Sequence, residues 1–339
     1  MKKKLRNILV LSLALMTTVA TAQDWNVDSR TRIDMSGDND KMVTDQRATL
    51  GATWGGSDWS IHVSSDVNYM LGSGAVSMGI YEAYASTDLM GYATVTAGRQ
   101  ALDLGSGALI SSNQWGAERT TWDGMTFDLG LDMADISLGY ASYNGGAADE
   151  ENTGNMWVNA SGEFSGWDVN LLYMTEEGTD ASDNAATGID ISGELMGAGI
   201  SASMNTDFNE NTMRVLGVSY AVNDDMSVNV GQTVYSEDGA FSMAGTNLSG
   251  GWANGNMGYL AAGDEMLSYG LTYNISGVSL GATMNTITNS VDADHSRDVM
   301  EVSLGYSLND NAALAVKYAT DATGDVESKY TWLTLTIRP

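Results

Sequence analysis

Apolar and polar residues alternate along almost the whole chain after residue 23, and this alternation restricts the fold more than any other feature. In residues 27–35 the odd positions carry apolar or hydroxyl side chains, whereas the even positions carry only Asp and Arg. A period of two places successive side chains on opposite faces of a β-strand. The only proline is Pro339, so no proline removes a backbone donor from a strand. The sequence therefore predicts an all-β chain whose long strands each have one apolar and one polar face.

The links between these strands alternate between short turns and longer polar segments. The longer segments are residues 36–45, 70–79, 100–119, 144–154, 176–187, 207–211, 236–245, 288–296 and 321–328. Short periplasmic turns and long extracellular loops are typical of up-and-down barrels in the bacterial outer membrane. Aromatic residues near the short turns, such as Trp54 and Trp59, fit an interfacial girdle. We predict a transmembrane antiparallel β-barrel of 18 strands, or of 20 if residues 246–253 and 255–262 form a further hairpin.

The N-terminus has the features of an export signal. Four basic residues precede an apolar run from Ile8 to Ala20, and Ala20-Thr21-Ala22 forms a small-residue cleavage site. We therefore predict a signal peptide over residues 1–22, a barrel over residues 23–339, and a location in the bacterial outer membrane. Removal of residues 1–22 leaves 11 of the 15 Lys and Arg with all 43 Asp and Glu, a formal charge of −32. Such an acidic chain is a poor partner for nucleic acid, and the absence of Cys excludes disulfides.

Residues that could carry catalysis are sparse. His62 and His295 are the only histidines, and the G-x-S-x-G pattern at residues 277–281 lies within an alternating segment rather than a strand–turn–helix. We expect no enzyme activity and no cofactor. The acidic segments, such as residues 149–151 and 292–294, form a solvated rim or hold divalent cations through carboxylate oxygens.

The few cations fall on the polar faces of the predicted strands, which face the barrel interior. By alternation these inward cations include Arg30, Arg32, Arg47, Arg297 and Lys317. They either pair with acids that stabilise the wall, or line a constriction that sets ion selectivity. The candidate acids are Asp28, Asp34, Asp66, Glu163 and Asp190.

Residues 97–127 contain the pattern A-G-R-Q-A-L-D-L-G, then N-Q-W, R-T and W-D-G, ending at Phe127. This segment resembles the corresponding stretch of alginate-export-type outer-membrane porins, and bacterial porins more broadly. The resemblance implies 18 strands, an anion-selective pore lined by arginines, and loops that close over it. By position it places Arg99 and Arg119 at the passage, although alternation puts Arg99 on the lipid face unless a bulge occurs at Gly98.

The same resemblance identifies residues 100–118 as a constriction loop, with Asp103, Trp115 and Glu118 at the pore mouth. This link is long and apolar for a loop, which favours a position inside the barrel. We therefore predict a porin for passive diffusion of small hydrophilic solutes, with anions or sugar acids as candidates. Its other partners would be outer-membrane lipid and further copies of the chain. The alternative is a structural or adhesive surface barrel whose extracellular loops bind a partner.

Overall fold

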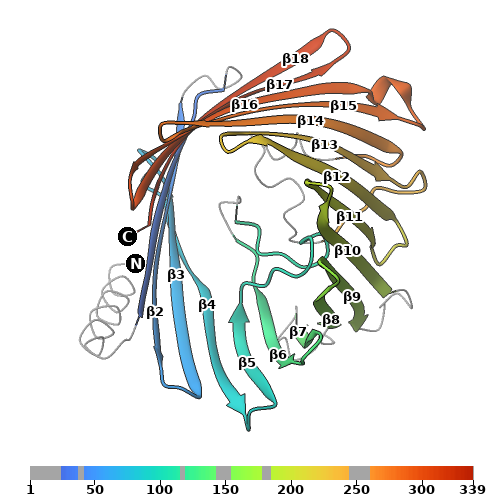
Figure 1. Ribbon diagram of the computed structural model, residues 1–339. Helices are drawn as coiled ribbons and strands as arrows, with labels where there is room; N and C mark the ends of the chain where they lie inside the picture. The colour runs from blue at the N-terminus through green and yellow to red at the C-terminus, as the bar shows by residue number, and fades with distance from the viewer. Residues whose placement is uncertain are drawn as a thin grey trace, which may run out of the picture.

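The computed structural model describes residues 24–36, 42–114, 119–142, 154–177, 185–243 and 260–338. These residues form one sheet of 18 antiparallel strands, which closes because β1 pairs with β18 as well as with β2 (Figure 1). The strands are β1 (Asp24–Asp34), β2 (Val43–Gly55), β3 (Trp59–Met70), β4 (Val76–Leu89), β5 (Ala93–Gln100), β6 (Trp122–Gly130), β7 (Asp135–Ser142), β8 (Gly154–Phe164), β9 (Trp167–Glu177), β10 (Ala185–Leu195), β11 (Ala198–Thr206), β12 (Thr212–Asn223), β13 (Met226–Tyr235), β14 (Asp264–Ile275), β15 (Val278–Asn289), β16 (Arg297–Asn309), β17 (Ala312–Thr323) and β18 (Val326–Ile337). The predicted up-and-down barrel is confirmed with 18 strands. The hairpin that would have raised the number to 20 lies mostly outside the described residues.

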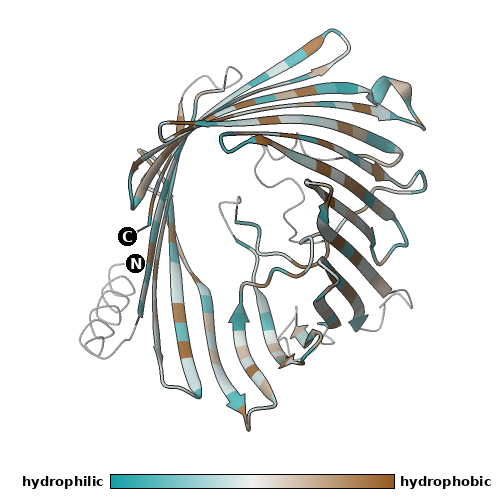
Figure 2. Ribbon diagram, viewed as in Figure 1, coloured by the Kyte–Doolittle hydropathy of each residue, from teal (hydrophilic) through white to brown (hydrophobic). Residues whose placement is uncertain are grey.

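The period-two pattern of the sequence becomes the two faces of the wall. Leu171 of β9 lies opposite Ile189 of β10, and both side chains are exposed on the outer face. The next pair, Asn170 and Asp190, points into the lumen. Figure 2 shows the same alternation of hydrophobic and hydrophilic residues along the strands. The outer face can therefore meet lipid, while closure pairs the backbone groups that hydrocarbon could not satisfy.

Aromatic side chains mark the end of the barrel at which the short turns lie. Trp25, Trp59, Tyr92, Phe164 and Tyr306 are exposed near these turns. Aromatic residues prefer the membrane–water interface, so this end of the barrel forms the predicted girdle. No helix in the described part of the chain is long and apolar enough to cross a membrane.

The tight turns at this end have a backbone geometry that suits two-residue hairpins. Both central residues have positive φ in Met90–Gly91, Ser165–Gly166, Met196–Gly197 and Ser276–Gly277. Positive φ at both positions is the signature of a type I′ turn, whose twist matches that of the flanking strands.

The predicted long link at residues 321–328 is wrong. Asp321 pairs with Ser328 and Thr323 with Val326, so β17 and β18 continue to a tight turn at Gly324 and Asp325. The alternation of polar side chains on an exposed hairpin resembles a loop in the sequence, because neither face is strongly apolar there.

The lumen contains an apolar cluster, which is unusual for the polar interior of a barrel. Ala108, Leu109 and Ile110 come from the β5–β6 connection and are almost fully buried. They belong to one cluster with inward residues of the wall, including Trp157 and Met174. Phe241 and Leu260 of the β13–β14 connection belong to the same cluster. Parts of two connections therefore pack inside the barrel rather than outside it.

Candidate functional site

Residues 101–114 of the connection between β5 and β6 enter the lumen and cross it (Figure 1). Its first half is a compact turn in which the Leu104 N–H donates to the Ile110 carbonyl at 3.1 Å. The Asp103 carboxylate accepts from both the backbone N–H and the hydroxyl of Ser112, at 2.9 and 2.7 Å. Asp103, which we predicted at the constriction, thus stabilises the first half of the inward loop through these two hydrogen bonds. Trp115 and Glu118 lie outside the described residues.

One end of this inward loop is tethered to β10. The Ser106 N–H donates to the Asp190 carboxylate at 2.9 Å, and Asp190 also accepts from the Ser203 hydroxyl at 2.6 Å. Gly105 has a φ of +56°, and a Cβ placed there would lie 2.2 Å from Asp190 Oδ2. The approach of the loop to β10 therefore requires glycine at residue 105.

Apolar packing reinforces this tether. A Cβ at Gly188 of β10 would lie 3.1 Å from Leu109 Cδ1, so the missing side chain makes room for Leu109. Long loops packed in this way are usually functional.

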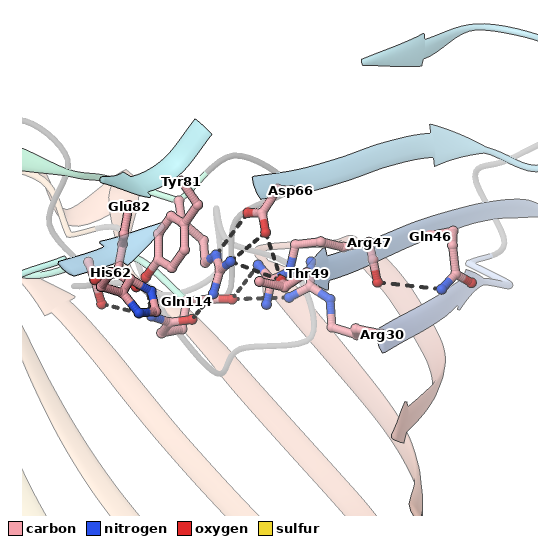
Figure 3. Close-up of polar contacts among 11 residues, drawn as sticks. Arg30, Gln46, Arg47, Thr49, His62, Asp66, Tyr81, Glu82 and Gln114 are labelled. Carbon is pink, nitrogen blue, oxygen red and sulfur yellow. Dashed lines mark hydrogen bonds and ion pairs between the residues drawn. The ribbon is translucent and has the colours of Figure 1, made fainter. Parts of the chain in front are cut away.

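The other end of the loop is held at the wall formed by β1–β4 (Figure 3). The Gln114 carbonyl accepts from Arg30 Nη1 at 3.1 Å and from Arg47 Nη1 at 3.3 Å. The Gln114 side-chain amide donates to the Tyr81 hydroxyl at 2.9 Å. Arg30 and Arg47 are directly opposite each other in the β1–β2 ladder, so one neutral carbonyl lies between two guanidinium groups.

Arg119 closes the loop with the densest set of contacts. Its guanidinium donates to both Asp66 carboxylate oxygens at 3.0 and 2.5 Å and to the Thr49 hydroxyl at 3.0 Å. The same group lies over the Tyr81 ring, 3.2 Å from the centroid. The Arg119 and Asp66 side chains are only 5% and 9% exposed. Bidentate pairs of this kind fix position as well as charge.

The two tethers lie on opposite sides of the barrel. Each strand pairs with the next one in the chain and β18 pairs with β1, so nine steps separate β1 from β10 in either direction. The described residues 101–114 therefore run as a chord from β10 to the β1–β2 wall. A chord inside the barrel leaves less cross-section for a solute than the wall alone would allow.

Four predicted arginines gather at one wall. Arg30, Arg32, Arg47 and Arg119 all lie beside β1–β3. Arg32 is 3.7 Å from the Asp45 carboxylate, and its guanidinium lies 4.8 Å from the Trp332 ring centroid. The ion pairs of Arg32 and Arg119 show the wall-stabilising role that we predicted as one alternative, whereas the role in ion selectivity stays a prediction.

The other predicted inward cations form ion pairs on β16 and β17. Arg297 Nη1 is 2.7 Å from Asp321 Oδ2, and Lys317 Nζ is 2.9 Å from Glu301 Oε1. These acids were not among the predicted partners. Asp190 and Glu163, which were, lie instead among the carboxylates on the β7–β10 side of the lumen.

Arg99 does not lie where the resemblance placed it. The β4–β5 and β5–β6 registers run without a shift through Gly98, so the bulge needed to turn Arg99 inward is absent. Arg99 pairs with Asp123 at 2.6 Å. Both side chains share the outer face with Met125, which is exposed. The prediction that Arg99 lines the passage is therefore wrong. Arg99 lies on the outer face, as simple alternation alone predicts.

Sequence reasoning missed Tyr81, which is buried and holds both Gln114 and Arg119. A register shift opposite Ser64 and Ser65 leaves Tyr81 as an extra residue between Ile80 and Glu82. Because of this bulge, the side chains of the consecutive residues Tyr81 and Glu82 both face the interior of the barrel. The only signal was the break in alternation at these residues.

The remaining residues that we considered for catalysis lie within regular strands of the barrel wall. Ser279 of the G-x-S-x-G pattern is a paired residue of β15 rather than the tip of a sharp turn. The His62 ring lies 3.6 Å from the Glu82 carboxylate and stacks on Tyr84. No three His, Asp or Glu side chains of the described residues converge in a metal-binding arrangement.

Comparison with known proteins agrees with this geometry. The chain matches the Gram-negative porin family over residues 10–337. No curated protein sequence matches it. The match supports the broader of the two resemblances seen in the sequence, the one to bacterial porins.

Solved channel structures share the fold at low sequence identity. OccK11 (OpdR) of Pseudomonas aeruginosa is 13% identical with a TM-score of 0.68, covering 93% of this chain and 95% of that one. OpdK of the same organism, solved with vanillate, is 12% identical with a TM-score of 0.73, covering 94% and 99%. OccAB4 of Acinetobacter baumannii is 12% identical with a TM-score of 0.70, covering 93% and 97%. From the family match over nearly its whole length, the chain belongs to the Gram-negative porins and is an outer-membrane channel protein for small solutes.

Proposed function

We propose that the protein is a passive diffusion channel that favours small anions, with sugar acids among the candidates. The proposal rests on one observation, which is that the inward loop ends against Arg30 and Arg47. A solute that passes this end of the loop travels beside guanidinium groups. Arg30 is the more accessible of the two, because Arg47 is only 5% exposed whereas Arg30 is half-buried.

The sign of the local field depends on the charges nearest the passage rather than on the net charge of the chain. Many of the surplus acids lie in the links between the strands, where salt screens them within a Debye length of about 8–10 Å. The arginines lie in a narrowed passage, where the effective dielectric is lower and each charge acts more strongly on a nearby ion. We therefore expect the cluster of arginines beside β1–β3 to determine which ions pass, as charged rings do in other pores.

Reversal potential tests this proposal. Purified protein in a planar bilayer with a tenfold KCl gradient should give the sign of a chloride-preferring pore, and Arg30→Ala should move that potential toward zero. Arg297→Ala is the matched control, because it removes an inward arginine of β16 that pairs with Asp321 of β17. A potassium-preferring sign in the unmodified protein would mean that the acids dominate the passage. No conductance at all would favour the surface barrel that binds a partner.

A further inference from the structure

Three turns at the periplasmic end expose methionine, and each of them joins at least one short strand. Met90, Met133 and Met196 are 86%, 74% and 96% exposed. Their turns lead to β5, β7 and β11, which have 8, 8 and 9 residues, and β5 is visibly shorter than β4 beside it (Figure 1). The turns at Ser165 and Ser276 instead join strands of 11 or 12 residues. Apolar turn tips therefore accompany the short strands.

The stability of the turns does not explain these methionines. Met90 and Met196 have φ of 57° and 53°, and the first central position of a type I′ turn favours Asn, Asp or Gly. An exposed leucine lies one or two residues before each methionine, and these are Leu89, Leu131 and Leu195. We call the pairs Leu89–Met90, Leu131–Met133 and Leu195–Met196 the methionine turns. Exposed apolar patches of this kind mark a contact surface.

Charged residues on the outer face measure the height of the apolar band. On β12 the exposed Arg214 lies opposite Met204 of β11, on the outer face. Ten residues later Asp224 lies in the periplasmic turn. Ten residues at about 3.4 Å each and a tilt of about 40° span roughly 26 Å of height, close to the expected band of about 25 Å. The residues between them on the outer face are all apolar or aromatic and exposed, namely Leu216, Val218, Tyr220 and Val222.

The same measure falls short on β6. Asp123 pairs with Arg99 on the outer face, and the two side chains are 49% and 40% exposed. A charge on the lipid face is least costly near the interface, so this pair marks the outer edge of the band. Leu129, the last outward residue of β6, follows only six residues later, which is roughly 16 Å of height. Ten residues from Asp123 lead to Met133, in the turn itself.

We propose that the periplasmic leaflet of the bilayer covers the three methionine turns, so that Met90, Met133 and Met196 contact lipid rather than water. The lipid-facing wall is continuous with these turns, because the outward residues Phe127 and Leu129 lead directly to Leu131. Polar groups of the same turns can stay at the headgroups, as the hydroxyl of an interfacial Tyr does. These groups are the Tyr92 hydroxyl and the exposed Asp132. The inference goes beyond the anion preference proposed above, since it concerns the outside of the wall.

Fluorescence quenching at each turn tests the proposal. The chain has no cysteine, so bimane can be attached at Met90→Cys, Met133→Cys or Met196→Cys. Ser276→Cys is the matched control, because Ser276 has positive φ at the same turn position as Met90. In vesicles that contain no other protein, a nitroxide on the lipid chains should quench the three methionine positions more strongly than position 276. Iodide in the water should give the opposite order.

Equal quenching by iodide at all four positions would overturn the proposal. The methionine turns would then lie in water, where only a protein partner could cover them. Heat-dependent electrophoretic mobility identifies the folded barrels to which the comparison applies. Reversal potential in the same membranes should be unchanged in every variant, because the turns lie at the end of the wall and away from the inward loop. A loss of the anion preference would therefore leave the quenching result intact, and the two proposals can fail separately.

Replacement of Met90 by asparagine gives a second measurement that needs no label. Asn suits the first position of a type I′ turn, so Ser276→Asn should not lower the urea midpoint of unfolding in lipid vesicles. Met90→Asn should lower that midpoint, because the amide replaces an apolar side chain that contacts lipid. A midpoint for Met90→Asn equal to or above that of the unmodified protein would show a turn in water and would overturn the proposal.

Discussion

Removal of the Arg119 side chain should release the inward loop from the β1–β4 wall. Arg119 makes two charge-assisted bonds to Asp66, one bond to Thr49 and a close contact with the Tyr81 ring. In Arg119→Leu, the Asp66 carboxylate, only 9% exposed, would keep the Thr49 hydroxyl as its one side-chain donor among the described residues. Breaking a buried pair in this way costs about 3–5 kcal/mol. If that cost falls on the docked state of the loop, the released population rises by roughly 10²-fold to 5 × 10³-fold.

Cysteine labelling measures that population, because the chain contains no cysteine of its own. Ala108 is 2% exposed inside the apolar cluster, so Ala108→Cys should react slowly with a small polar thiol reagent. When opening and closing are fast, the labelling rate follows the open population. Arg119→Leu should therefore speed labelling by up to about 5 × 10³-fold.

Two controls distinguish this explanation from general loosening of the barrel. Arg297→Leu breaks a comparable pair on β16 and β17 and should leave the labelling rate of Ala108→Cys unchanged. Asp66→Asn added to Arg119→Leu should recover part of the loss, because no uncompensated carboxylate remains. A labelling rate that changes less than about twofold in Arg119→Leu would refute the view that this end holds the loop, since a loss of even 1.4 kcal/mol is tenfold.

Two further predictions follow from local geometry. Gly105→Ala should destabilise the loop tip by at least about 1–2 kcal/mol, the cost of a left-handed conformation, and the close approach to Asp190 adds to it; faster labelling of Ala108→Cys would show this, and an unchanged rate would mean that the tip can move without loss. Ile189→Arg on the outer face should destabilise the barrel in a bilayer by about 2–4 kcal/mol, whereas Ser192→Arg on the inner face should not, as measured by urea unfolding in lipid vesicles; equal losses would contradict the assigned faces.

The wall of the barrel follows from the sequence because alternation is a local property. Each residue needs only its neighbours in the chain to define its face, and this is why Arg30, Arg47, Arg297 and Lys317 were placed inward correctly. Arg99 shows the strength of the same rule. Alternation put it outside, and only the family resemblance moved it to the passage. The structure agrees with alternation, since a regular register leaves no residue over to turn the side chain.

The interior of the lumen could not be predicted to the same depth. The apolar character of residues 102–110 indicated an inward loop, but not that it ends on Asp190 at one side and on Arg30 at the other. Those partners lie 84 residues away in each direction, and barrel closure brings them together. Tyr81 needs a bulge in β4, and a bulge shows in the sequence only as a broken alternation.

Single-channel conductance after shortening the inward loop tests the central claim most directly. Deletion of residues 105–113 removes the hydrogen bond to Asp190 of β10 and the apolar side chains of Leu109 and Ile110. All 18 strands remain, and so do the arginines of β1 and β2. The account predicts folded barrels, identified by heat-dependent mobility, with a larger unitary conductance than the unmodified protein in the same salt. An unchanged conductance from folded barrels would contradict it, because the chord across the lumen would then not be the part that narrows the channel.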